Sequence, residues 1–111
     1  MVYYSTDLDT TFAALSDPTR RAIISKLAEG EVPIMELASP FAMSLPAVSK
    51  HIRVLERAGL VVRTKRGRVH TCRLNARPLR EAAKWLAFYR QFWEERLDSL
   101  ASFLEEEPDS R

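Results

Sequence analysis

The sequence contains few of the residues that form disulfides and metal sites. Its single cysteine, Cys72, excludes an intrachain disulfide, a thiolate metal cluster and a CxxC redox pair within one protomer. Two histidines are present, far apart in the sequence, and none follows His70. Because two distant imidazoles and one thiol do not supply the ligands of a zinc-like site, we expect no metal ion and no other cofactor.

Long hydrophobic runs are also missing. No stretch approaches the roughly 18 uninterrupted apolar residues that cross a bilayer, and the first ten residues lack the basic-then-apolar order of a signal peptide. We therefore expect a cytoplasmic protein that does not contact a membrane. The 111 residues are 46% hydrophobic and 29% charged, which is typical of one globular domain. We assign residues 1–104 to this domain and residues 105–111 to an acidic, flexible tail.

Catalytic constellations are missing as well. The sequence has no Gly-rich phosphate loop and no Ser, His and Asp set with plausible neighbours, and its clustered carboxylates lie in the acidic tail. We therefore expect that the protein is not an enzyme.

The net charge of +2 conceals an uneven distribution of charge. Residues 1–49 carry a net charge of −3, residues 50–90 carry +10, and residues 91–111 carry −5. A cationic block between acidic flanks is typical of a surface that binds a polyanion such as nucleic acid. The alternative interpretation of this block is an ordinary solvated helix face.

Apolar periodicity and turn residues predict a mainly α fold with a small β-hairpin. Helices are expected at residues 8–15, 18–29, 34–38, 44–58 and 78–104, and the hairpin strands at 60–65 and 69–74. Asp17 is a suitable N-cap for the second helix and Ser44 for the fourth. The last helix, roughly 40 Å long, exceeds what so small a domain can cover.

The expected fourth helix has one apolar and one cationic face. Leu45, Val48, Ile52 and Leu55 form a narrow apolar stripe, and Pro46, Lys50, Arg53 and Arg57 lie opposite. The hairpin that follows places three cations around Gly67, which permits positive φ. This order of elements is that of a winged helix-turn-helix, whose second helix enters the major groove while the wing contacts the flanking backbone. The predicted DNA contacts are Ser44, Pro46, Ala47, Ser49, Lys50, His51, Arg53, Arg57, Arg63, Lys65, Arg66 and Arg68.

The apolar arc of the last helix covers about 220°, more than an ordinary surface helix buries. Part of this arc must therefore contact another chain. The predicted interface residues are Leu8, Phe12, Leu79, Leu86, Tyr89, Trp93, Leu97 and Leu100. The aromatic cluster of Trp85, Phe88, Tyr89, Phe92 and Trp93 is interpreted as interface core, and the alternative is a pocket for an apolar small-molecule effector.

Three segments resemble one family. They are Ser16-Asp17-Pro18-Thr19-Arg20-Arg21, Glu36-Leu37-Ala38, and the run from Leu45 to Val61, LPAVSKHIRVLERAGLV. Together they resemble the ArsR/SmtB group of bacterial winged-helix transcription regulators, and the resemblance spans most of the chain. It implies a homodimer built on the first and last helices that binds double-stranded DNA at an imperfect palindrome. Such a protein usually represses its own operon until a signal releases it.

The chain departs from the metal-sensing members of that group. Where thiol sensors carry paired cysteines on the third helix, this chain has Pro33-Ile34-Met35-Glu36-Leu37-Ala38. Where other sensors pair Asp and His on the last helix, Asp98 stands without a histidine. The resemblance therefore indicates a member that lacks the metal-sensing ligands.

Several residues admit two interpretations. His51 could reach a phosphate or merely pack at the edge of its helix. His70 is interpreted as a strand residue rather than a pH switch, and Cys72 as a half-buried filler unless it pairs between chains. Asp17 with Arg20 and Arg21 forms a capped helix start, although one arginine could also contact phosphate.

The rival to a sequence-specific regulator is a protein-interaction module. In that case the basic block of residues 50–90 docks an acidic partner, and the long last helix is its own binding surface. A nonspecific, nucleoid-type DNA-binding protein is the other alternative.

Overall fold

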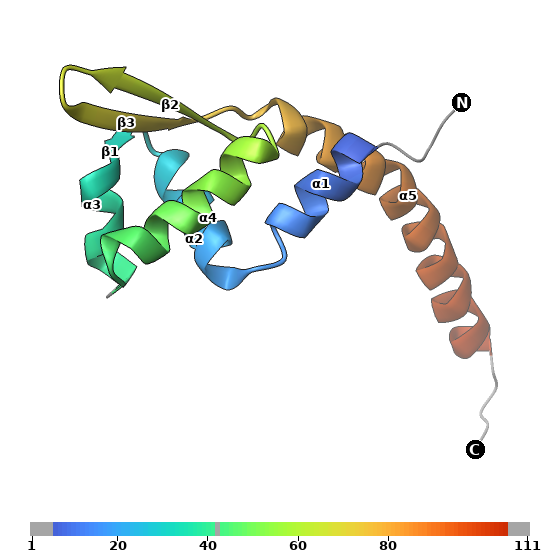
Figure 1. Ribbon diagram of the computed structural model, residues 1–111. Helices are drawn as coiled ribbons and strands as arrows, with labels where there is room; N and C mark the ends of the chain where they lie inside the picture. Colours follow the sequence, from blue (N-terminus) through green and yellow to red (C-terminus); the bar gives the residue numbers. More distant parts are fainter. Residues whose placement is uncertain (1–5, 42, 107–111) are drawn as a thin grey trace.

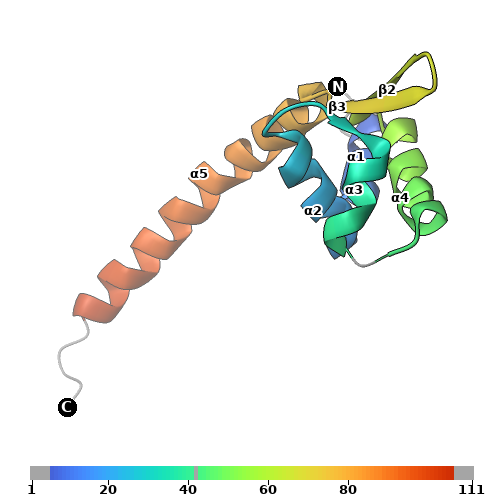
Figure 2. The same ribbon diagram turned by 90° about the vertical axis from the view of Figure 1, so that its left-hand side faces the viewer.

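The computed structural model describes residues 6–41 and 43–106 (Figure 1). The elements in chain order are α1 (Thr6–Ala14), α2 (Pro18–Leu27), β1 (Val32–Pro33), α3 (Ile34–Ala38), the 3₁₀ turn η1 (Ser39–Phe41), α4 (Leu45–Arg57), β2 (Val61–Arg66), β3 (Val69–Leu74) and α5 (Arg77–Glu106). The β-hairpin lies over α2, α3 and α4, and α5 leads away from them beyond α1. Figure 2 shows α5 projecting far from the remainder of the molecule. The predicted mainly α fold with a small hairpin is confirmed.

Side-chain caps set the starts of α2 and α4, as the sequence predicted. Oδ2 of Asp17 accepts a hydrogen bond from the Arg20 amide at 3.0 Å, and Oγ of Ser44 accepts from the Ala47 amide at 3.3 Å. The predicted end of α2 was two residues late, because the Gly30 amide already donates to the Leu27 carbonyl at 3.1 Å.

The last helix is longer than predicted. It begins at Arg77 and runs through Glu106, so residues 105 and 106 belong to α5 rather than to a tail. The rest of the predicted tail, residues 107–111, lies outside the described residues. Although α5 has 30 residues, no helix in the described ranges combines the length and apolar character of a membrane span.

The sheet has one strand more than predicted. Its order is β1-β3-β2, and both pairings are antiparallel. In the strand that the sequence did not predict, Val32 pairs with Cys72 and Pro33 with Thr71. The strand β2 starts at Val61, since Leu60 instead accepts from the Asn75 amide at 2.8 Å and donates to the Leu55 carbonyl at 2.9 Å.

The core lies between the sheet and α2, α3 and α4. Its largest completely buried side chains are Ile23, Leu37, Val48, Ile52, Leu55, Leu60 and Cys72. Two predictions need correction. Leu45 is 37% exposed, because it begins α4 one turn ahead of the first buried residue, and Cys72 is fully rather than half buried, because its strand is the central one.

Candidate nucleic-acid interface

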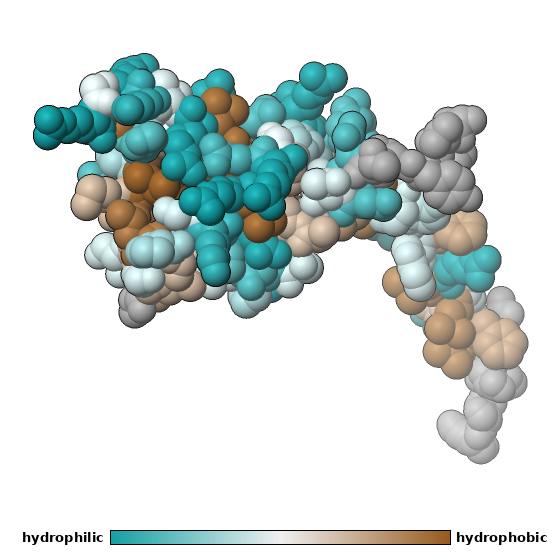
Figure 3. Space-filling model, in the orientation of Figure 1, coloured by the Kyte–Doolittle hydropathy of each residue, from teal (hydrophilic) through white to brown (hydrophobic). Residues whose placement is uncertain are grey.

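One face of α4 packs in the core, and the opposite face is exposed to solvent. Val48, Ile52 and Leu55 are completely buried in the core, and Lys50 and Arg53 on the opposite side are exposed. Ser44, Pro46 and Arg57 are also exposed, while Ala47 and Ser49 are half-buried. Figure 3 shows hydrophilic surface over the part of the molecule that carries α4. The arrangement gives a rigid helix with small residues near its start and cations along its outer side.

The wing, defined as β2, β3 and the turn between them, carries its cations at the tip. Lys65, Arg66 and Arg68 are all exposed, and Gly67 adopts a φ of +62° in the turn. Figure 1 shows this tip extending beyond the helices. Because these cations are exposed, they suit contacts with a phosphate backbone.

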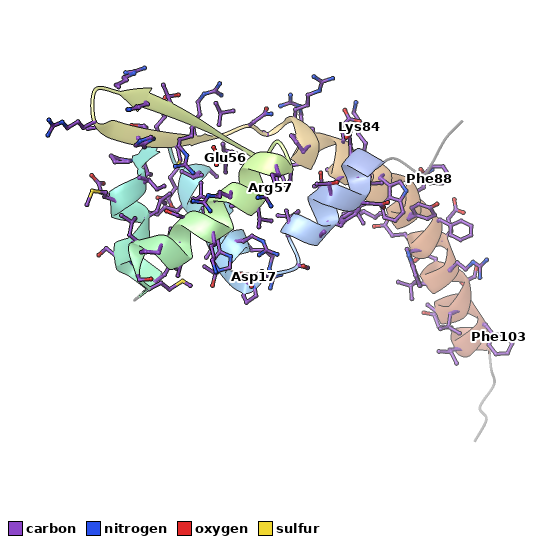
Figure 4. All side chains as sticks on the ribbon, in the orientation of Figure 1. Asp17, Glu56, Arg57, Lys84, Phe88 and Phe103 are labelled. Atoms are coloured by element: carbon purple, nitrogen blue, oxygen red, sulfur yellow. The ribbon has the colours of Figure 1, made fainter. Side chains whose placement is uncertain are left out.

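An ion pair joins the wing to α4. The Nη2 and Nε atoms of Arg63 on β2 donate to the two carboxylate oxygens of Glu56 at 2.9 and 3.3 Å. Figure 4 shows Glu56 on α4, below the wing. Two parallel charge-assisted hydrogen bonds fix distance and orientation together. The guanidinium of Arg63, a predicted DNA contact, is therefore engaged within the protein.

The predicted contact residue His51 touches α2. Its Nδ1 atom lies 3.3 Å from Nη1 of Arg20 and 3.9 Å from Oδ2 of Asp17. His51 thus packs at the edge of α4, and a phosphate contact through its other nitrogen stays a prediction. The hydrogen bond from the Arg20 amide lowers the pKa of Asp17, although partial burial opposes the shift.

The two arginines that follow Asp17 donate hydrogen bonds to carbonyl groups at the end of α1. Arg20 donates from Nε to the Ala14 carbonyl at 2.7 Å, and Arg21 donates from Nη1 to the Leu15 carbonyl at 2.7 Å. The last carbonyls of a helix lack intrahelical partners and attract cations. Both arginines are therefore used within the protein, which disfavours the alternative that one of them contacts phosphate.

The helices α1 and α5 pack together through aromatic rings. The ring of Phe12 meets that of Trp85 at 5.7 Å between centroids, and Trp85 meets Tyr89 at 4.8 Å. Leu79, a predicted interface residue, instead packs against the core of its own protomer, because it lies in the first turn of α5. Phe12 is likewise half-buried within the protomer.

Beyond that packing, α5 exposes apolar side chains along its length. Among predicted interface residues, Trp93 is 63% exposed and Leu97 is 58% exposed. The others are Leu86, Tyr89 and Leu100. Phe103, which belongs to the predicted apolar arc, is exposed too, and the sequence interpretation missed Leu104. Figure 3 shows hydrophobic patches on the far half of α5, and Figure 4 labels Phe88 and Phe103 along it. An apolar surface of this extent indicates contact with another molecule.

A groove of about 1050 Å³ lies between α1, the start of α5 and the turn after α4. Trp85, Phe88 and Tyr89 line it, whereas Phe92 and Trp93 do not. Its other walls carry charges of both signs, from Asp7, Arg57, Arg77, Glu81 and Lys84. This mixed lining differs from an apolar cavity, so the small-molecule effector stays a prediction.

The remaining candidate residues show no arrangement for metal chemistry. Across residues 6–41 and 43–106, no three His, Cys, Asp or Glu side chains gather where they could hold a metal ion. Burial raises the pKa of the Cys72 thiol, against a lowering effect of Arg63. The thiol is therefore protonated and sheltered at neutral pH.

Comparison with known proteins supports the interpretation of these elements. A family model described as a helix-turn-helix domain matches residues 15–64. The HTH-type transcriptional regulator Rv2034 of Mycobacterium tuberculosis is 36% identical over 101 residues, covering 91% of this chain and 92% of that protein. The transcriptional repressor SdpR of Bacillus subtilis is 30% identical over 79 residues, covering 71% of this chain and 88% of that protein.

A solved structure agrees with these relatives. The crystal structure of the ArsR family transcriptional regulator RHA00566 is 42% identical and has a TM-score of 0.77, covering 85% of this chain and 97% of that one. The chain therefore belongs to the ArsR family of winged helix-turn-helix transcriptional regulators, which act by binding DNA.

Proposed function

We propose that the protein is a homodimeric repressor that binds an imperfect palindrome in double-stranded DNA. The observation that carries this proposal is the helix α4, whose apolar face is completely buried while its cationic face is exposed beside a basic wing. A helix of this kind fits the major groove, which is about 12 Å wide. The relative SdpR is named a transcriptional repressor, which favours repression here.

Individual roles follow from exposure. Lys50 and Arg53 are exposed on α4 and are assigned to base edges or to the phosphates beside them. Ser44, Pro46, Ala47, Ser49 and Arg57 are assigned to close contact with the groove and backbone, and Lys65, Arg66 and Arg68 to flanking phosphate. Arg63 is left out, because Glu56 already holds its guanidinium.

We assign the exposed apolar surface of α5 to contact with a second copy of the chain. This helix of 30 residues spans about 45 Å. Two copies of the chain that pair along α5 would place two α4 helices in one dimer. Half-sites on DNA are read about 34 Å apart, one helical turn. A two-fold symmetric pair of protomers therefore suits a palindrome.

The proposal is tested by selecting bound fragments from random duplex DNA with the full-length protein. We expect a palindromic site that binds roughly a thousandfold or more tighter than random duplex. Equal affinity for both would refute the proposal and favour an interaction module or a nonspecific DNA-binding protein.

Variants separate base contacts from phosphate contacts. Arg53→Ala should cost about 1–3 kcal/mol on the selected site and relax preference at one position per half-site. Arg66→Ala should weaken binding to every sequence and reduce the slope of log K against log salt by about 0.9. Lys26→Ala, at an exposed cation outside the basic block, is the matched control and should change neither. An unchanged slope in Arg66→Ala would remove the wing from the interface.

The dimer is tested by sedimentation. Trp93→Ala and Leu86→Ala should give monomers that bind the selected site weakly, whereas Gln91→Ala, exposed on the opposite side of α5, should stay dimeric. Fully dimeric Trp93→Ala and Leu86→Ala variants would overturn the assignment of this surface.

A further inference from the structure

The side chain of Arg20 joins three helices. It departs from α2, donates from Nε and Nη2 to the carbonyls of Ala14 and Ala13 at 2.7 and 3.3 Å, and places Nη1 at 3.3 Å from Nδ1 of His51 on α4. One planar group thus holds the end of α1 and the flank of α4 at the same time.

The chemistry of this contact assigns a role to Nδ1 of His51. A guanidinium carries only donors, so Nδ1 of His51 must accept the hydrogen bond. Asp17 anchors the backbone of Arg20, since its Oδ2 accepts a hydrogen bond from the Arg20 amide at 3.0 Å. Figure 4 shows Asp17 below α4, where the start of α2 approaches that helix.

Arg20 links α1 to α4, and these two helices have different roles in the proposed function. The helix α1 packs on α5 through Phe12 and Trp85, which places it with the proposed dimer contacts. The helix α4 carries the exposed cations Lys50 and Arg53. A palindrome is bound tightly only when both copies of α4 stand at the separation of its half-sites.

We propose that Arg20 is a positioning residue that sets the placement of α4 relative to α1 and α5, and so sets the half-site separation that the dimer accepts. This inference rests on the proposed dimeric, palindrome-binding function. A lysine cannot replace the arginine, because one ammonium group cannot span two carbonyls and an imidazole with fixed, coplanar donors.

The neighbouring residue offers a matched control. Arg21 donates to the Leu15 carbonyl at 2.7 Å and so serves the same end of α1, and no contact of its side chain with α4 is found within the described ranges. A variant of Arg21 therefore loses a comparable hydrogen bond without disturbing the link to the reading helix.

The experiment uses the full-length protein and three duplexes: the selected palindrome, and the same half-sites moved together or apart by one base pair. For the unaltered protein we expect at least a tenfold preference for the selected separation. Arg20→Lys should stay dimeric by sedimentation but prefer the selected separation by less than threefold. Arg21→Lys should keep the full preference, even if it melts at a lower temperature.

Variants of His51 test the same link from the other side and do not depend on whether Arg20→Lys folds. His51→Asn retains an acceptor near the position of Nδ1 and should keep the preference among the three duplexes. His51→Leu removes the acceptor and should lose it. If Nε2 also contacts phosphate, both variants lose affinity for all three duplexes equally, and the ratio still reports the link to Arg20.

Each result decides between the proposals. A full preference in Arg20→Lys or His51→Leu overturns the positioning role while the proposed function stands. Loss of preference in Arg21→Lys also overturns it, because the effect then comes from the end of α1 alone. An unaltered protein that is monomeric, or indifferent to half-site separation, overturns the proposed function together with this inference.

Discussion

Replacing Glu56 by Gln should loosen the wing from α4 at a measurable cost in stability. Arg63 donates twice to this carboxylate, at 2.9 and 3.3 Å, and the two side chains are 24% and 30% exposed for Arg63 and Glu56. Exposed ion pairs contribute about 0–1 kcal/mol, whereas breaking a buried pair costs about 3–5 kcal/mol. For a half-buried pair with two parallel hydrogen bonds, we expect a coupling energy of about 1–2 kcal/mol.

A double-mutant cycle with Glu56→Gln, Arg63→Gln and the double variant measures this coupling by urea unfolding. All samples need one protein concentration, because dimerisation contributes to apparent stability. Arg90 and Glu94 on α5 provide the matched control, since their 3.0 Å pair is 77% and 60% exposed. Their coupling should be about 0.3–0.5 kcal/mol. Equal coupling in the two cycles would refute the argument from burial.

The same substitution has a consequence for DNA binding. Glu56→Gln removes an anion beside the wing and releases the guanidinium of Arg63. If the freed group reaches a phosphate, the salt dependence should steepen by about 0.9 in slope. An unchanged slope would show that Arg63 serves only to hold the wing.

Three further predictions concern single residues. Because burial raises the pKa of Cys72, iodoacetamide should modify the native protein no faster than it unfolds, as followed by mass spectrometry; rapid modification would contradict the assigned burial. The lowered pKa of Asp17 means that its stabilising effect is present above the ordinary carboxyl pKa and is lost as pH falls through the lowered value. Asp17→Asn, which keeps a capping oxygen, should therefore lose less stability in acid than the unaltered protein, and identical acid unfolding curves would argue against this. Gly67→Ala should cost about 1 kcal/mol from the positive φ alone, since an added Cβ meets no atom within 4 Å; a urea-measured loss above about 3 kcal/mol would indicate an unseen steric contact.

The features that the sequence predicted well are those that depend on near neighbours. The caps at Asp17 and Ser44 each satisfy an amide three residues ahead, so the pattern is visible in a short window. The buried stripe of α4 follows from helical periodicity, except at Leu45, whose place in the first turn leaves it beyond the core. Periodicity reports which residues share a face but not how far a neighbouring element extends.

The features that the sequence missed depend on residues far apart in the chain. The strand β1 has two residues, too few to show alternation, and it is defined only by pairing with β3 some 40 residues later. The contact of Arg20 with His51 spans 31 residues and requires the packing of α2 on α4. Glu56 and Arg63 are only seven residues apart, but their ion pair was missed as well, because it depends on how the turn at Gly59 folds β2 back toward α4.

The projecting tip of the wing has a consequence for the kinetics of binding. Its exposed cations stand clear of the helices, so an approaching phosphate backbone meets them without displacing buried groups. Peripheral charges of this kind change association rates and their salt dependence, whereas closely packed contacts set the dissociation rate. We therefore expect wing variants to slow the capture of DNA, and variants of α4 to shorten the lifetime of the complex once formed.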